Sequence, residues 1–367
     1  MIFIIGSGLI GLSIGFKLIT NGFEVTIFNY DDSRESSLAS VGMLAPIIEA
    51  KPSEEDLFNL LELSKKKWEE YAKKISEHSS LEINFKKTSA LMVANNFDDL
   101  QRLKFKQKFF LKLGKNIDFL DREETLKFEP NLNDNVQGSL YCKSQDQVNP
   151  INLKMCLKDC FLKNGGKIIN KNIEKIIFEN KKVGVSYDGE KFYSDKIILA
   201  AGAWSQKVLK RSFSINISSK PLKGVSLNLS CNNNQKITHN LWFRNIYIAP
   251  RDDNEIMVGA TEDDRGFKSG INIDEIFFLV KNLKESLPFT EELEIKSLNS
   301  GLRPASYDGL PIIGTIDEIS KSIICAFGHY RHGVLLSPIT AELVYDVIMG
   351  KKINQSLSPT RFLKKKL

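Results

Sequence analysis

The sequence is poor in residues that would indicate a metal centre, a disulfide framework or a membrane anchor. Its 367 residues include five cysteines and four histidines, and neither a CxxC nor an HExxH pattern occurs. An odd number of cysteines without paired spacing is typical of reduced thiols, so we expect a cytoplasmic protein without a metal. No run of 18 apolar residues occurs, and the uncharged first 16 residues are too short for a membrane-spanning helix and lack a basic leader. We therefore expect no membrane insertion.

The net charge is also small for the length. Lys and Arg number 51 and Asp and Glu 45, which gives +6 without visible clustering. This balance predicts no nucleic-acid partner. The hydrophobic fraction of 42% is that of a globular protein, and at roughly 150 residues per domain the length predicts about two domains. The composition leaves the oligomeric state open, a homo-oligomer included.

A strand, a glycine-rich turn, a helix and a second strand are predicted within the first 30 residues. Residues 2–5 form an apolar run typical of a buried parallel strand, residues 9–19 have helical periodicity, and residues 24–28 are the second strand. Between the first strand and the helix lies a GxGxxG motif, which consists of Gly6, Ser7, Gly8, Leu9, Ile10 and Gly11. Its glycines permit a tight turn, close approach of a diphosphate and close helix packing. The motif predicts a dinucleotide site.

One position departs from the dinucleotide pattern. The second strand of such a unit normally ends on an acidic residue that binds the ribose hydroxyls, and here Asn29 occupies that place. Asparagine accepts a hydrogen bond but carries no charge, and Asp31 and Asp32 are close enough in sequence to substitute for it. The departure weakens the case for NAD and leaves FAD untouched.

Several separated segments carry a resemblance to a known family. They are the stretch 40–46 with Ser40, Gly42, Met43 and Leu44, the strand and glycine turn 197–205, Gly-Leu-Arg-Pro at 301–304, the stretch 308–314, and Gly-His-Tyr-Arg-His-Gly at 328–333. With the GxGxxG motif they span nearly the whole chain in order. In these features the sequence resembles the FAD-dependent D-amino acid oxidase family, and within it the glycine oxidases of thiamine biosynthesis.

The resemblance implies an α/β fold with two domains. The FAD-binding, Rossmann-like domain would be discontinuous and consist of residues 1–80, 140–215 and 300–367. A smaller α+β substrate domain, built on an antiparallel sheet, would consist of residues 81–139 and 216–299. The sequence pattern fits this division, with a helix predicted at 151–164, a hairpin at 182–187 and 190–193, short strands at 225–229, 246–249 and 256–260, and a helix at 274–286.

An amino acid oxidase must hold the substrate carboxylate beside the flavin. Arg303 is our candidate, because a guanidinium offers two parallel donors that match a carboxylate, although an arginine in a loop often forms only a surface ion pair. The resemblance also implies substrate contacts for Tyr247, which alternatively is a core tyrosine, and for Arg331 through its backbone carbonyl. We predict that Arg331 lies in a turn before a helix that starts near Val334, whose N-terminus favours an anionic reduced flavin.

The resemblance further implies a set of flavin-binding residues: Gly6, Ser7, Gly8, Leu9, Ile10, Gly11, Asn29, Ser40, Gly42, Met43, Leu44, Ile173, Ala201, Gly202, Trp204, Arg303, Gly328, Arg331, His332, Gly333, Val334 and Leu335. No general base is needed if the amine binds in its neutral form, so His329 and His332 are not required for proton transfer. Of the two, His332 is expected to contact cofactor or solvent. No cysteine lies in 301–314 and Cys325 lies in an apolar strand, so we expect non-covalent FAD.

The expected reaction is oxidation of a small amino acid by hydride transfer to FAD, with O2 as acceptor and H2O2 as product. Glycine is the first candidate, sarcosine and small D-amino acids are others, and the imine would serve thiamine thiazole synthesis. The alternatives are a dehydrogenase that passes electrons to a carrier, a tRNA-modifying FAD oxidoreductase, and a non-enzymatic FAD-binding protein. Glu262 either lies in a solvated acidic loop or faces the pocket and disfavours acidic substrates.

Overall fold

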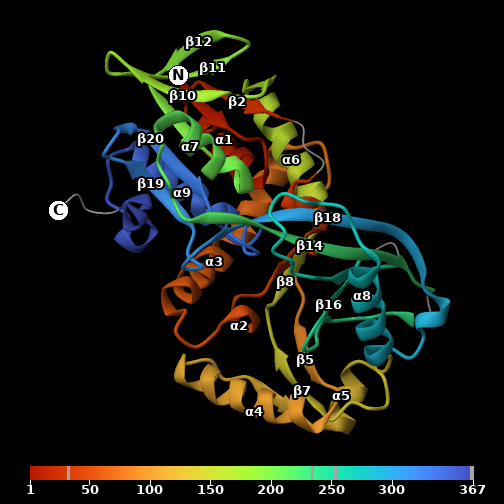
Figure 1. Ribbon diagram of the computed structural model, residues 1–367. Coiled ribbons are helices and arrows are strands. Elements are labelled where there is room, and N and C mark those ends of the chain that lie inside the picture. Colours follow the sequence, from red (N-terminus) through yellow and green to blue (C-terminus); the bar gives the residue numbers. More distant parts are fainter. Residues whose placement is uncertain (31–33, 233–234, 252–253, 364–367) are drawn as a thin grey trace.

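The computed structural model describes residues 1–30, 34–232, 235–251 and 254–363, and Asp31 and Asp32 lie outside this part. Two large sheets organise the molecule (Figure 1). The first is a mainly parallel sheet and the second a mainly antiparallel one. The structure confirms the α/β class with a Rossmann-like sheet that the sequence predicted.

Six strands form the first sheet in the order β19, β20, β13, β1, β2 and β9. Their bounds in that order are Ile312–Ile316, Ser320–Phe327, Lys196–Leu199, Ile2–Ile5, Val25–Asn29 and Lys167–Asn170. All run parallel except β19, which is antiparallel to β20. The central position of β1 explains why its four residues are all apolar: Ile2 and Ile4 belong to the core on one face, Phe3 and Ile5 to the core on the other.

Helices cover one face of this sheet and a small sheet covers the other. On the first face α1 (Leu9–Ile19), α3 (Glu55–His78), α6 (Pro150–Lys163) and α9 (Ser337–Ile348) pack against one another. On the second face lie β10 (Lys175–Glu179), β11 (Lys182–Tyr187), β12 (Glu190–Ser194) and α7 (Ser205–Phe213). Figure 1 shows this hairpin region at the end of the molecule beside the first strands.

Eight strands form the second sheet in the order β18, β14, β17, β16, β15, β5, β7 and β6. Their bounds are Glu294–Ser306, Ser219–Ser230, Glu255–Gly259, Tyr247–Pro250, Asn240–Trp242, Ala90–Ala94, Gly138–Cys142 and Asp118–Leu120. Neighbours are antiparallel except β15 and β5. The sheet therefore uses strands that run across the boundaries expected at residues 140 and 300.

Shorter elements complete the fold. Helices α4 (Phe97–Lys112), α5 (Arg122–Phe128) and α8 (Ile273–Ser286) accompany the second sheet, as Figure 1 shows. A three-stranded sheet of β3 (Met43–Leu44), β8 (Asp146–Val148) and β4 (Phe85–Lys86) lies near α2 (Pro46–Glu49). The long strands β14 and β18 reach the 3-10 helix η1 (Ser36–Ala39), which brings the second sheet to the edge of the first.

The helix predicted near Val334 begins later than expected. Residues 333–336 form turns, and α9 starts at Ser337 with Pro338 in its first turn. A proline fits the first turn because no intrahelical partner is needed for its missing N–H. The helix predicted to start near Val334 is therefore present but starts three residues later, and residues 333–336 beside the site are turns.

Candidate active site

A cavity of about 730 Å³ extends from the turn after β1 to the strands β16 and β18. Binding sites for small molecules and cofactors span roughly 300–1,000 Å³, so the volume fits a large ligand. Most predicted site residues line it: Gly6, Ser7, Gly8, Leu9, Ile10, Asn29, Ser40, Ile173, Ala201, Gly202, Trp204, Tyr247, Arg303, Arg331, Gly333 and Val334. The structure does not bring Gly11, Gly42, Met43, Leu44, Gly328, His332 or Leu335 to the cavity wall.

Each of the three glycines of the GxGxxG motif is needed for a different structural reason. Gly6 has φ +112°, and a Cβ there would lie 2.4 Å from the carbonyl oxygen of Ala200. A Cβ on Gly11 would lie 1.9 Å from the carbonyl oxygen of Gly6, so this glycine permits helix and turn to touch. A Cβ on Gly8 would meet nothing within 4 Å. Gly8 thus borders open space at the N-terminus of α1, where helix N–H groups attract an anion.

Arg303 and Tyr247 converge at the other end of the cavity. Arg303 lies on β18 and its guanidinium passes over Gly224 of β14, where a Cβ would stand 2.2 Å from Nη2. Tyr247 lies on β16 and its ring passes over Gly259 of β17, where a Cβ would stand 2.4 Å from the ring. Burial raises the pKa of Tyr247, and the Arg303 guanidinium opposes that shift. The phenol therefore stays protonated and remains a hydrogen-bond donor beside a fixed positive charge.

Arg331 also lines the cavity and is paired with Glu49. Its Nε lies 2.9 Å from a carboxylate oxygen of Glu49, which ends α2. Burial acts to raise the pKa of Glu49, but Arg331, His332, Lys106 and Lys51 together outweigh burial, and the pKa lies below its usual range. Conversely, Glu49 raises the pKa of Arg331. The side chain of Arg331 is thus held by a partly buried carboxylate, and its predicted backbone contact with the substrate amine stays a prediction.

Comparison with known proteins agrees with this geometry. Residues 1–347 match the DAO family of FAD dependent oxidoreductases. The chain belongs to this family. It is 27% identical over 360 residues to the glycine oxidase of Geobacillus kaustophilus (strain HTA426). The match covers 97% of this chain and 94% of that protein. The crystal structure of glycine oxidase from Geobacillus kaustophilus superimposes with a TM-score of 0.93 at 26% identity and covers 99% of both chains.

A further relative is a longer, bifunctional protein. The bifunctional protein ThiO/ThiG of Trichormus variabilis (strain ATCC 29413 / PCC 7937) is 28% identical over 362 residues. The match covers 97% of this chain and 54% of that longer protein. Together these relatives support flavin-dependent oxidation of an amino acid by this oxidoreductase, and FAD is its cofactor.

The cavity suits FAD in charge as well as in volume. Among the described residues that line it, six side chains are basic and one, Glu35, is acidic; the basic ones are Lys171, Lys207, Lys210, Arg211, Arg303 and Arg331. Such a wall attracts an anionic diphosphate, and Gly8 leaves the space that it needs. Cys325 is fully buried in β20, and burial raises the pKa of its thiol above the usual range. We therefore keep the prediction that FAD binds without a covalent bond.

Asn29 lies where a ribose-binding residue is expected. It lines the cavity and accepts a hydrogen bond from the Ser7 hydroxyl through its side-chain oxygen. Its amide nitrogen donates to the side-chain oxygen of Asn170 at 3.0 Å. The side chain is therefore oriented by one neighbour on the glycine-rich turn and by another on β9.

Glu262 does not line the cavity but is linked to it. The side chain is exposed and accepts a hydrogen bond from the hydroxyl of Tyr330, which does line the cavity. Burial and this bond raise the pKa of Tyr330 above its usual range. Neither expectation for Glu262 describes this arrangement fully, because the carboxylate is solvated and at the same time tied to the pocket rim.

The two histidines near the site are buried and uncharged. His329 is 2% exposed, and its Nε2 lies 3.0 Å from the hydroxyl oxygen of Thr340. His332 is 5% exposed. Burial lowers the pKa of His329 to about 3 and that of His332 to about 4. His329 lines the cavity and His332 does not, the reverse of the expectation that His332 would contact the cofactor.

These values predict a loss of stability in mild acid. Both folded pKa values lie below that of an unfolded histidine, about 6.5. Between pH 6.5 and pH 5 the unfolded chain therefore binds more protons, and the free energy of unfolding falls by about 1 kcal/mol per pH unit for each histidine. Urea unfolding of the FAD-saturated protein at several pH values measures this slope. In His329→Gln the slope should decrease; an unchanged slope would contradict the assignment.

Sequence reasoning missed several residues that build the site. Gly224 and Gly259 provide the passages for the guanidinium and the phenol, and the carbonyl oxygens of Lys223 and Thr261 hold Arg303. A glycine inside a strand often marks such a close approach, so the glycines were a usable signal. Glu49 carried no signal, because its partner Arg331 is far away in the sequence.

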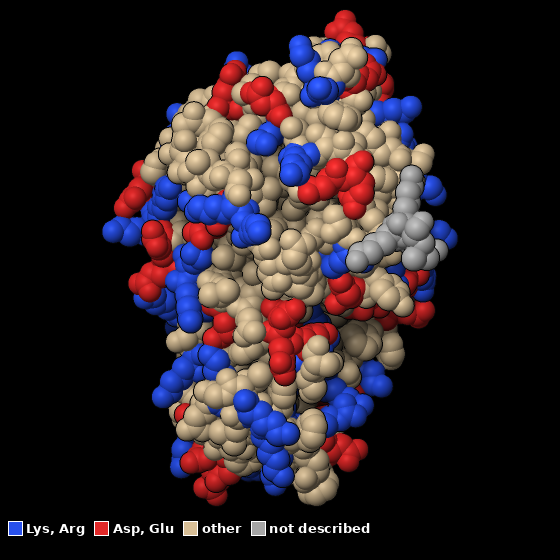
Figure 2. All heavy atoms as spheres, turned by 90° about the vertical axis from the view of Figure 1, so that its left-hand side faces the viewer, with Lys and Arg blue, Asp and Glu red and all other residues tan. Residues whose placement is uncertain are grey.

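Charged side chains of both signs share the face of the molecule that Figure 2 shows, where basic and acidic side chains are interspersed. Within residues 1–30, 34–232, 235–251 and 254–363, no three His, Cys, Asp or Glu side chains gather in a way that could hold a metal ion. In the same part of the chain no helix is both long and apolar enough to cross a bilayer.

Proposed function

We propose that this oxidoreductase oxidises a small amino acid, with glycine as the first candidate. The observation that carries the proposal is the convergence of Arg303 and Tyr247 in the cavity that begins at the GxGxxG turn. A guanidinium and a neutral phenol form a donor set for one carboxylate. Glycine oxidases are similar to this chain over nearly its full length, which favours glycine and sarcosine over larger substrates.

The residues of the chain then act by positioning. FAD supplies the two-electron acceptor when it is bound. Arg303 and Tyr247 hold the carboxylate and so direct the α C–H of the substrate toward the cofactor end of the cavity. His329 and His332 stay neutral at pH 7, and a histidine with so low a pKa is a weak base. We therefore expect the substrate to enter the reaction with a neutral amine.

The products of the reaction depend on which electron acceptor reoxidises the flavin. With O2 as the acceptor, oxidation of a primary amino acid yields H2O2 and the free imine, and water then hydrolyses the imine to the oxoacid and ammonia. The relative that combines ThiO with ThiG supports a supply of this imine to thiamine biosynthesis. The alternative acceptor is a carrier, and stoichiometric H2O2 at air saturation distinguishes an oxidase from such a dehydrogenase.

The experiment that tests the proposal is anaerobic mixing of the FAD-bound protein with single amino acids. Glycine or sarcosine should bleach the flavin absorbance, bulky D-amino acids should do so more slowly, and D-aspartate should not do so. The carboxylate of Glu262, which is bound to Tyr330 at the rim of the cavity, would repel the second carboxylate of D-aspartate as it enters. Bleaching by D-aspartate faster than by glycine would contradict the proposed substrate, and an absence of bleaching with every amine would contradict the enzymatic function.

A further inference from the structure

Lys223 is a buried lysine that the proposed reaction does not use. It lies on β14 between Leu222 and Gly224 and is 1% exposed. Because side chains alternate along a strand, it leaves the sheet on the face opposite to Gly224, over which the guanidinium of Arg303 lies. A lysine is rarely buried to this extent unless it is paired. Its contacts therefore need an explanation.

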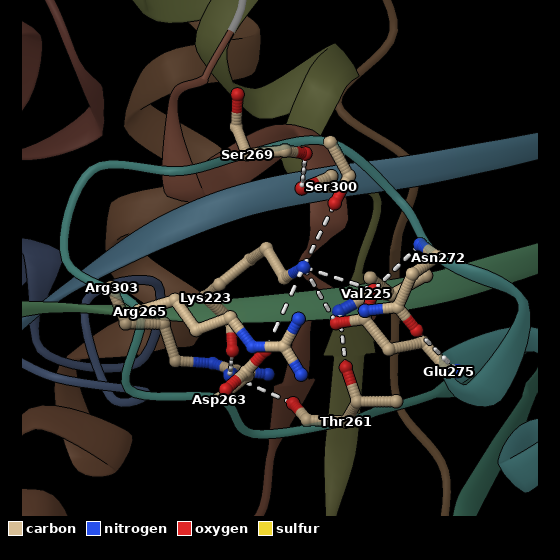
Figure 3. Close-up of polar contacts among 11 residues, drawn as sticks. Lys223, Val225, Thr261, Asp263, Arg265, Ser269, Asn272, Glu275, Ser300 and Arg303 are labelled. Carbon is tan, nitrogen blue, oxygen red and sulfur yellow. Dashed lines mark hydrogen bonds and ion pairs between the residues drawn. The ribbon is translucent and has the colours of Figure 1, made fainter.

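The ammonium group of Lys223 joins three parts of one segment. Its Nζ donates to the carbonyl oxygen of Gly270 at 2.8 Å and lies within 2.9 Å of both carboxylate oxygens of Glu275. A carboxylate oxygen of Asp263 lies 3.8 Å away and is also paired with Arg265. Figure 3 shows these groups gathered around the lysine. The charge of Lys223 thus balances two carboxylates, one of them at the start of α8.

The main chain of Lys223 binds the same segment at its beginning. Its N–H donates to the carbonyl oxygen of Asp263 at 2.9 Å, and the N–H of Asp263 donates back at 3.0 Å. Next to this pair, the hydroxyl of Thr261 accepts from the N–H of Val225 at 3.0 Å. One residue therefore holds the segment 261–275 at both ends, through its backbone at Asp263 and through its side chain at Gly270 and Glu275.

Arg303 is held by carbonyl groups of Lys223 and of the same segment. Its Nη1 donates to the carbonyl oxygen of Thr261 at 3.0 Å and to that of Lys223 at 3.3 Å. These bonds use the two hydrogens of Nη1, and the remaining donors of the guanidinium face Tyr247 and the cavity. A displacement of the segment at Thr261 would rotate the guanidinium, because one of its two acceptors lies on that segment and the other is the carbonyl oxygen of Lys223, which is paired with Asp263 of the same segment.

We propose that Lys223 is a positioning residue for Arg303 and sets the orientation in which the guanidinium meets the substrate carboxylate. The inference rests on the proposed function, since it requires that Arg303 binds a carboxylate. Without the ammonium group, Glu275 would be left as a buried carboxylate without this cation, whereas Asp263 would keep Arg265 as its partner. The segment 261–275 would have to move for Glu275 to reach water, and this movement would shift the carbonyl oxygen of Thr261 that orients Arg303.

A double-mutant cycle in the FAD-bound protein tests this coupling. The probe is glycolate, which keeps the carboxylate of glycine and carries a hydroxyl in place of the amine, and its Kd is measured by calorimetry. Lys223→Met should weaken glycolate binding about tenfold in the wild-type background and have no further effect in Arg303→Ala. Glycolate is titrated to high concentration so that weak binding in the Arg303→Ala background is measured.

Lys220→Met is the matched control. Lys220 lies on the same strand and pairs with Asp264 of the same segment, but both side chains are more than half exposed. It should leave the Kd unchanged, and Lys223→Arg should restore most of the loss. If Lys223→Met does not fold, Asp263→Asn is used in its place. This variant should weaken glycolate binding less than Lys223→Met, and its effect should also disappear in the Arg303→Ala background.

Two results would overturn the inference. Equal weakening by Lys223→Met with and without Arg303 would show a general structural role and leave the proposed function intact. If Arg303→Ala itself does not change the Kd of glycolate, both the inference and the proposed carboxylate site are wrong. Thermal unfolding and FAD content of each variant separate a loss of folding from a loss of binding.

Discussion

Replacing Arg303 by alanine is expected to lower kcat/KM for glycine on the order of a thousandfold while FAD stays bound. The guanidinium is oriented by the carbonyl oxygens of Lys223 and Thr261 at 3.3 and 3.0 Å, so its remaining donors are already directed when a carboxylate arrives. Charge-assisted bonds of this kind are about twice as strong as neutral ones. Steady-state kinetics with glycine, together with the flavin absorbance of the purified variant, measure the effect.

Two further variants make the result specific. Arg303→Lys should recover little activity, because an ammonium lacks the planar pair of donors and would not bond both carbonyls and a carboxylate. Arg244→Ala is the control, since Arg244 is 48% exposed and only weakly paired with Asp99 at 3.9 Å. Near-normal kcat/KM in Arg303→Ala would show that the carboxylate is held elsewhere.

Replacing Gly8 by valine is expected to abolish FAD binding without unfolding the protein. The backbone of Gly8, with φ −69° and ψ 177°, is one that valine adopts readily, and a Cβ there meets no protein atom within 4 Å. The side chain would instead occupy the space that the diphosphate needs at the N-terminus of α1. Titration of the apoprotein with FAD and thermal unfolding of the same sample measure the two quantities.

Replacing Gly11 of the same motif by valine is expected to have the opposite effect, because it should destabilise the fold itself. A Cβ on Gly11 would stand 1.9 Å from the carbonyl oxygen of Gly6, so helix and turn would have to separate. We expect this variant to lose stability even without FAD. If Gly8→Val bound FAD with wild-type affinity, the diphosphate would not lie at this turn.

The first 30 residues show how far local sequence patterns predict this structure. The helix predicted at 9–19 is α1, Leu9–Ile19, and the apolar run 2–5 is β1. Such predictions succeed because the local sequence pattern matches the environment of the segment. The strand β1 is apolar throughout because it is buried on both faces, and the glycines are needed for the close contacts within the turn itself. The helix predicted at 274–286 likewise matches α8, whose start at Ile273 is marked by the capping residue Asn272.

Other features could not be predicted because they depend on contacts between distant segments. The sequence predicts a helix that starts near Val334, whereas α9 starts at Ser337 with Pro338 in its first turn. The pairing of Arg331 with Glu49 needs α2 to lie beside the turn after β20, and no local pattern shows this. The same holds for Glu262 and its bond to Tyr330.

By itself, the sequence determined the dinucleotide turn, because this turn depends on residue types at short spacing. It also carried the motifs of the family, and the resemblance to that family made Arg303 and Tyr247 candidates. Only the tertiary structure decided that these two side chains meet. The strand register places Gly259 of β17 opposite Tyr247 of β16 and opposite Ser226 of β14. It also places Arg303 of β18 opposite Leu222 of β14. The ring of Tyr247 can therefore lie over Gly259, and the guanidinium of Arg303 over Gly224. The physical reason is that register is set by the packing of whole strands, which no short segment specifies.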